Sequence, residues 1–176
     1  MYLFRRNYAI CLTALALILS LVGAAWAQTA TPTASEPAKN YGQAVSLLDQ
    51  AEQQLNAGNL PVALSLVKQS NSLFTLLQKD SAAKLAEREL SAKESEQLAI
   101  NQKLGEEAQA KADSFLPTAT AKKKQAEELR AKGQAEAGDA AERESREQYL
   151  EVQKFSIKSA IYALRNQQII FRFLAP

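Results

Sequence analysis

The sequence contains no histidine, and its single cysteine is Cys11. These residue types supply most nucleophile–base pairs and soft metal ligands. Beyond Cys11 the chain therefore lacks a Ser-His-Asp or Cys-His system, a standard zinc site and a thiol redox pair. Glycine occurs only six times, and never in a glycine-rich strand-to-helix turn that would cradle a phosphate. Adjacent carboxylates, such as those at 106–107 and 127–128, lie in highly charged helical stretches and are typical of solvated surface. We therefore predict a protein that is not an enzyme and has no cofactor and no metal site.

Long apolar runs are scarce as well, and the most pronounced one stands near the start of the chain. Arg5 and Arg6 precede an apolar run over residues 8–22, and an A-x-A pattern follows at 25–27. This is the organisation of a secretory signal peptide. It predicts cleavage near Ala27 and export to the periplasm or another extracytoplasmic space. The alternative is an uncleaved anchor, but residues 10–27 are only about the minimum span of a bilayer. Cys11 lies within the apolar run rather than after a cleavage site, which argues against a lipoprotein.

An excess of charge of one sign is also missing. Removal of residues 1–27 takes away Arg5 and Arg6 and no acid, so equal numbers of basic and acidic residues remain. A neutral chain has little of the positive field that attracts phosphates, so we predict no nucleic-acid partner. Residues 28–39, QTATPTASEPAK, have no apolar stripe and indicate a disordered linker. The rest is long enough for one modest core, which must be held by packing because disulfides are absent.

The best-patterned stretch is residues 40–78, which predict a helical hairpin. Asn40 is the expected N-cap of the first helix, Gly58 ends that helix in the left-handed conformation, and Asn59 caps the second. Pro61 then stands in the first turn of the second helix. So short a connection makes the two helices antiparallel neighbours that bury their apolar stripes against each other. The stripes comprise Ala44, Leu47, Leu48, Ala51 and Leu55, then Val62, Ala63, Leu66, Val67, Ser70, Leu73, Phe74 and Leu77.

The turn of this hairpin resembles the inter-helix region of a tetratricopeptide repeat. Gly58 and Asn59 stand at the turn, and Ala63 and Leu64 stand where a small residue lets two helices approach closely. The stretch departs from that family where Leu47 replaces a frequent tryptophan and where no proline closes a unit of roughly 34 residues. The resemblance implies a binding or scaffolding module rather than chemistry.

Beyond residue 78 the chain predicts further helices. Residues 80–115 indicate one long polar helix, preceded by a break at Asp80-Ser81. Pro117 is expected to end that helix, because proline disfavours the helical conformation of the residue before it. Residues 118–173 then predict the C-terminal helices, with a turn between Gly133 and Gly138 and a last helix from about Asp139. The apolar stripe of this last helix should cover the hairpin, and it comprises Leu150, Ile157, Ile161 and Leu164.

A fainter second copy of the hairpin is indicated by a constant offset of 75 residues, which relates Ala51-Glu52 and Gly58 to Ala126-Glu127 and Gly133. Residues 116–149 also resemble the Ala-rich helical domains of uncharacterised bacterial envelope proteins. Helical repeat arrays need about three units to be stable, so two imperfect units favour a closed bundle. We predict an all-α fold of four to five antiparallel helices, in a bundle or a short tetratricopeptide-like array.

The surface candidates indicate binding. The tail, Ile169, Ile170, Phe171 and Phe173, has three explanations: docking onto its own bundle, contact with a partner protein, or contact with a membrane. The lysines at 122–124 are interpreted as solubilising, because acids follow at 127 and 128. The leading hypothesis is an exported, non-enzymatic protein-binding or scaffolding module of the bacterial cell envelope, with Gly58, Asn59 and Ala63 shaping its hairpin. The alternatives are a periplasmic holdase-type chaperone and a helical spacer, and no pattern indicates a particular partner or oligomeric state.

Overall fold

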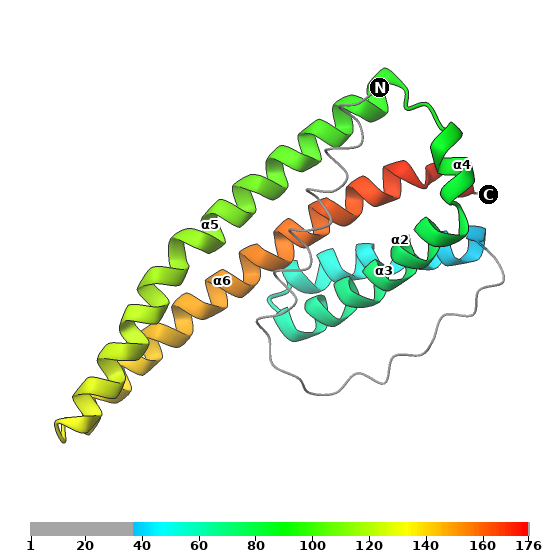
Figure 1. Cartoon of the computed structure of the whole chain (residues 1–176). Coiled ribbons are helices and arrows are strands. Elements are labelled where there is room, and N and C mark those ends of the chain that lie inside the picture. The colour runs from blue at the N-terminus through cyan, green and yellow to red at the C-terminus, as the bar shows by residue number, and fades with distance from the viewer. Residues whose placement is uncertain (1–36, 176) are drawn as a thin grey trace.

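The computed structural model describes residues 37–175, and in them the predicted all-α fold is confirmed as a helical bundle (Figure 1). The signal peptide at 1–27 and the linker at 28–36 lie outside the described residues. None of the described helices combines the length and apolar character needed to cross a membrane. The helices are α2 (Pro37–Asn56), α3 (Leu60–Asp80), α4 (Ala82–Glu87), α5 (Ala92–Ala131), α6 (Ala135–Ile170) and the 3-10 helix η1 (Arg172–Leu174).

The first hairpin consists of α2 and α3, and its turn is made at Gly58. This glycine has a φ of +78°, a backbone conformation that favours glycine because a Cβ would be strained there. The backbone N–H of Asn59 donates to the Gln54 carbonyl at 2.9 Å, which satisfies one of the last carbonyls of α2. The expected cap by the Asn59 side chain is wrong. That side chain donates instead to Gln54 Oε1 at 2.8 Å, an exposed hydrogen bond that links the two ends of the turn.

The start of α2 also differs from the expectation. We predicted Asn40 as the N-cap and residues up to 39 as linker, but α2 begins at Pro37 and Asn40 lies buried inside it. A proline is well accommodated in the first turn of a helix, because its missing N–H has no partner there. The next residue, Tyr41, is buried and donates its hydroxyl to the Gln168 carbonyl at 3.1 Å. This tertiary contact ties the first turns of α2 to the end of α6.

The hydrophobic core lies between the first hairpin and the C-terminal half of α6. Phe74 on α3 stacks on Phe171, with ring centroids 6.1 Å apart, and both side chains are almost fully buried. We expected the covering stripe of α6 to begin at Leu150, which is wrong because Leu150 is 54 % exposed. The α6 side of the core comprises Ile157, Ala160, Ile161, Leu164, Ile170 and Phe171.

The expected single helix over 80–115 is also wrong, because the chain breaks between α4 and α5. Ser91 and Glu94 form a capping box that starts α5: the Glu94 N–H donates to Ser91 Oγ at 3.3 Å, and the Ser91 N–H donates to Glu94 Oε2 at 3.0 Å. Just before it, Arg88 pairs with Glu94 at 2.6 Å and donates to the carbonyls of Ile169 and Ile170. This joint connects the start of α5 to the end of α6.

Pro117 does not end a helix, and α5 is continuous from Ala92 to Ala131. A proline in a helix interior removes one backbone hydrogen bond and crowds the preceding turn. Here Ala112 and Ala119, on either side of it, are 1 % and 0 % exposed against α6. Packing along α6 therefore keeps α5 continuous through the proline, which itself faces solvent.

α5 and α6 pack along a seam of small residues. On α5 the buried positions are separated by three, four or seven residues, the spacing of a coiled-coil heptad. They are Asn101, Gly105, Ala108, Ala112, Ala119 and Ala126. The expected turn between Gly133 and Gly138 is only partly right: Gly133 has a φ of +76°, but Gly138 lies inside α6 and is buried in this seam. α6 begins at Ala135, four residues earlier than the expected start at about Asp139.

The linked ends of α5 and α6 extend beyond the first hairpin, as Figure 1 shows in yellow and light orange. We call residues 115–155 the arm. Phe115 and Phe155 stack at its base with ring centroids 5.9 Å apart. The α5 half of the arm is about 25 Å long at the rise of an α-helix. The arm is therefore a two-helix projection that is supported from its base.

The arm repeats the internal contacts of the first hairpin at the offset of 75 residues. Ser70 Oγ donates to the Ala44 carbonyl at 2.9 Å, and Ser145 Oγ donates to the Ala119 carbonyl at 2.9 Å. All four residues are buried. The two turns also match, with Gly58 and Gly133 at φ +78° and +76°. The two hairpins thus share one internal geometry, although their outward residues differ.

Candidate functional site

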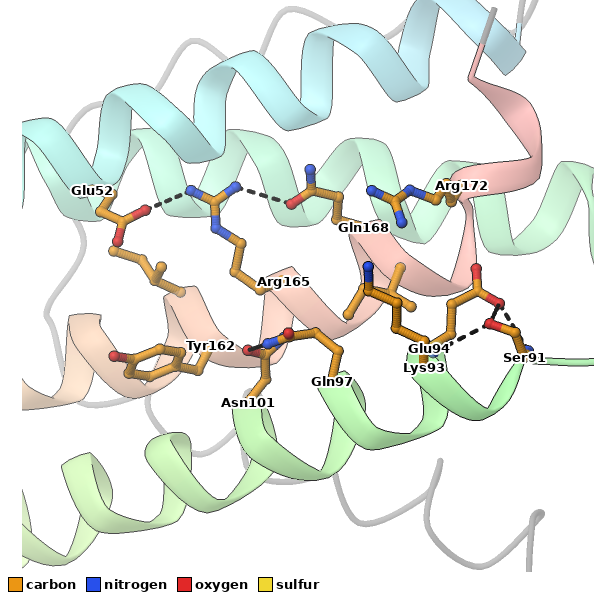
Figure 2. Close-up of a pocket in the computed structure, with 12 residues that line it drawn as sticks. Glu52, Ser91, Lys93, Glu94, Gln97, Asn101, Tyr162, Arg165, Gln168 and Arg172 are labelled. Carbon is orange, nitrogen blue, oxygen red and sulfur yellow. Dashed lines mark hydrogen bonds and ion pairs between the residues drawn. The ribbon is translucent and has the colours of Figure 1, made fainter.

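A groove of about 640 Å³ opens between α2, the start of α5 and the C-terminal half of α6 (Figure 2). It exists because α2 and α5 lie on α6 at its two sides and make little contact with each other. Its apolar surface comes from α6, chiefly Tyr162 and Ile169, with the buried Ile161 beneath them. The polar lining comprises Glu52, Ser91, Lys93, Glu94, Gln97, Asn101, Arg165, Gln168 and Arg172.

Arg165 stands in the middle of the groove and fixes α6 to α2. Its guanidinium pairs with Glu52 at 2.5 Å and donates to Gln168 Oε1 at 2.9 Å (Figure 2). It also pairs with Asp49 at 2.8 Å. Burial would lower the pKa of Arg165, but the hydrogen bonds that it donates to Glu52 and Asp49 outweigh this effect, so the pKa is raised. Arg165 is therefore a permanently charged group that is already neutralised by its neighbours.

The two other cations of the groove differ from Arg165 in their exposure and their ion pairing. Lys93 on α5 and Arg172 on η1 are both exposed. Neither one forms an ion pair with any carboxylate among residues 37–175, whereas the acids of the lining, Glu52 and Glu94, are both paired. The end of the groove between α5 and η1 therefore presents positive charge that could attract an anionic group.

The α5 wall of the groove is rigid. Ser91 and Glu94 are held in the capping box, and their hydrogen bonds lower the pKa of Glu94 from its usual value, with the backbone N–H of Ser91 as the largest cause. Gln97 Nε2 donates to Asn101 Oδ1 at 3.1 Å one turn further along. In the described part of the chain no three acidic residues gather into a metal-binding cluster. What the lining offers is charge, amide groups and an apolar floor, which suit the binding of a peptide segment.

The residues predicted from the sequence fall mostly elsewhere. Gly58, Asn59 and Ala63 form the turn and close contact of the first hairpin, with Ala63 0 % exposed, and do not line the groove. The lysine run at 122–124, which the sequence indicates to be solubilising, is partly paired within the arm, where Lys122 contacts Glu144 at 2.5 Å.

The predicted tail residues lie in three different environments. Ile170 and Phe171 are packed into the core, so they present no surface to a partner or membrane. Ile169 lines the groove. Phe173 is 37 % exposed, and the Arg88 guanidinium lies 5.5 Å from its ring.

Sequence reasoning missed Lys93, Arg165 and Arg172 as site residues. Arg165 was visible as a cation on an otherwise apolar stretch of helix, a pattern that often marks a tertiary ion pair. Lys93 and Arg172 carry no local signal, because only the fold brings the start of α5 beside η1.

Comparisons with protein-family models, curated proteins and solved structures found no match for this chain.

Proposed function

We propose that the protein is an exported, non-enzymatic helical module that binds a segment of a partner protein in the groove between α2, α5 and α6. The observation that carries this proposal is the groove itself, with an apolar floor on α6 and, at one end, two cations that form no ion pair within residues 37–175, Lys93 and Arg172. Export rests on the signal-peptide organisation of residues 1–27.

The charges specify what kind of segment would bind. Its acidic side chains or terminal carboxylate would pair with Lys93 and Arg172, and its apolar side chains would cover Tyr162 and Ile169. The side-chain amides of Gln97 and Gln168 can hydrogen-bond a peptide backbone. The segment is thus an acidic, partly apolar peptide.

The test places a photo-crosslinking amino acid at Gln97, which is exposed and lines the groove, in the native envelope. We expect one dominant crosslinked protein, and its yield should fall about tenfold in the Lys93→Glu, Arg172→Glu double variant. Lys68→Glu is the matched control, because Lys68 is exposed on α3 and does not line the groove. No crosslinked species, or an equal loss with Lys68→Glu, would overturn the proposal.

The two alternatives give different results in simple assays. A holdase-type chaperone would suppress the aggregation of an unrelated denatured protein at near-stoichiometric ratio and would crosslink to many clients rather than one. A helical spacer would keep its role when Lys93, Gln97 and Arg172 are scrambled at constant length. The projecting arm is the feature that favours a spacer role.

A further inference from the structure

The first hairpin has one face that is entirely apolar, and the rest of the chain covers it. Tyr41, at one end of this face, donates to the Gln168 carbonyl of α6 at 3.1 Å, and Phe74 stacks on Phe171 at 6.1 Å. All members of the face are buried: Tyr41, Leu48, Leu55, Leu60, Val67 and Phe74. The end of α6 and the residue that follows it therefore act as the cover of this hairpin.

Among residues 37–175 no helix end covers the corresponding face of the arm. At the offset of 75 residues, Tyr41 and Phe74 become Leu116 and Tyr149, which are 40 % and 37 % exposed. The Tyr149 hydroxyl lies 3.5 Å from Thr120 Oγ1, which places the tyrosine against α5 one turn from Leu116. The remaining equivalents are Lys123, Arg130, Ala135 and Glu142.

Some charged residues of this face form ion pairs with one another, and one does not. Arg130 and Glu142 pair with each other at 3.6 Å, and Arg130 also pairs with Asp139 at 2.8 Å. Lys123, which replaces Leu48, is exposed and forms no ion pair among the described residues. It lies seven residues from Leu116, or about 10 Å along the helix. The face thus combines an apolar pair with one available cation two turns away.

We propose that this face of the arm, Leu116, Lys123 and Tyr149, binds an amphipathic helix of another protein, which carries an acidic residue opposite Lys123 and a large apolar residue on Leu116 and Tyr149. The helical form follows from the first hairpin, whose equivalent face is covered by a helix end. The acidic residue of the bound helix is expected because Lys123 is positively charged and forms no ion pair among the described residues. Tyrosine and leucine in this setting are effective anchors, since a tyrosine adds a hydrogen-bonding hydroxyl to a large apolar ring.

A second copy of this chain is a poor occupant. The segment that would cover the arm in another copy is the end of its own α6, and Ile157, Ile161 and Leu164 of that segment are already buried in its core. The inference does not rest on the groove, which lies on a different part of α5 and α6.

The probe is a fluorescent peptide with the sequence of residues 155–174 carrying Leu164→Glu. Leu164 precedes Phe171 by seven residues, the same separation as that between Leu116 and Lys123. The glutamate at position 164 can therefore face Lys123 when Phe171 lies on Leu116. Fluorescence anisotropy with the chain from residue 28 onward, which holds every described helix, measures its affinity. We expect Leu116→Asp or Tyr149→Asp to weaken binding at least about tenfold. Lys123→Glu should reverse the preference, so that the Leu164→Lys peptide binds more tightly than the Leu164→Glu peptide.

Val62→Asp is the matched control, because Val62 is an equally exposed aliphatic residue, 49 % accessible, on α3. It should leave binding unchanged, as should Lys93→Glu with Arg172→Glu, so that failure here and failure of the groove are distinguishable. Absence of binding, or equal binding to all variants whose circular dichroism is unaltered, would overturn the inference. A dimer in sedimentation that Leu116→Asp dissociates would also overturn it, in favour of a second copy.

Discussion

Two glycines in the α5–α6 seam should respond in opposite ways to replacement by alanine. A Cβ built on Gly105 would meet Tyr162 Cβ at 3.5 Å and the Ser159 carbonyl at 3.7 Å, which are ordinary contacts. A Cβ on Gly138 would stand 2.7 Å from Arg130 Cγ and 3.1 Å from the Ala126 carbonyl, which is too close. Both glycines lie inside helices and are buried, so the main difference between them is the space available to the added methyl group.

The magnitudes follow from this geometry. Alanine is favoured over glycine in a helix interior by about 1 kcal/mol, so Gly105→Ala should stabilise the fold by about that amount. Gly138→Ala must displace the base of the Arg130 side chain and push α6 away from a backbone carbonyl of α5. Overpacking of this kind costs about 1–3 kcal/mol. Because Gly138 is only the fourth residue of α6, less propensity is gained there, and we expect a net loss of about 1–2 kcal/mol.

Urea denaturation followed by far-UV circular dichroism measures both changes, and Gly42→Ala is the control. Gly42 lies inside α2, and a Cβ there would have no heavy atom within 4 Å, so this variant reports helix propensity alone. Gly105→Ala should match or exceed Gly42→Ala, and Gly138→Ala should fall below the unaltered protein. In thermal melts, the two seam variants should then differ in melting temperature by about 4–12 °C. A rise in stability for Gly138→Ala would refute the close approach of the helices at this point.

Three further changes test other parts of the fold. Phe171→Ala should cost about 3–5 kcal/mol of unfolding free energy, because this side chain is 1 % exposed, and a smaller effect in a urea titration would place the tail outside the core. Pro117→Ala should stabilise the protein, by up to about 3 kcal/mol, because it restores a backbone donor inside α5; an unchanged melting temperature would mean that the helix ends there. Hydrogen bonds from Ser91 hold the pKa of Glu94 below its usual 4.5, so its stabilising contribution is present above pH 4.5 and is lost as pH falls through the lower folded-state value. Glu94→Gln should therefore flatten the acid side of a stability–pH profile, and an unaltered profile would contradict the capping role.

Several features could be read from residues because their causes are local. Gly58 and Gly133 both take a positive φ, and a glycine between two helical stretches is the usual sign of such a turn. The capping box of Ser91 and Glu94 was equally readable as an S-x-x-E pattern, although we predicted an uninterrupted helix there. The coiled-coil spacing of α5 was harder to see, because its buried residues are mostly alanine rather than leucine.

The errors occurred where distant parts of the chain outweigh local preference. Pro117 alone predicts a break, but the burial of Ala119 against α6 keeps the helix continuous. Leu150 has the right spacing for the core stripe, yet it lies on the arm, beyond the reach of the first hairpin. The end of α6 packs against α5 on one side and against the first hairpin on the other. One apolar stripe read from the sequence does not show that two faces of the helix have different neighbours.

Helical periodicity and glycine conformation act within a few residues, so the amino-acid pattern alone predicts that the described chain is helical and where its two tight turns fall. Which faces of the described helices remain open depends on tertiary packing. The groove depends on α2 and α5 lying at opposite sides of α6, and the arm depends on α5 and α6 being longer than the hairpin beside them. Both are products of helix length and packing order, which bring together residues more than a hundred positions apart, such as Glu52 and Arg165.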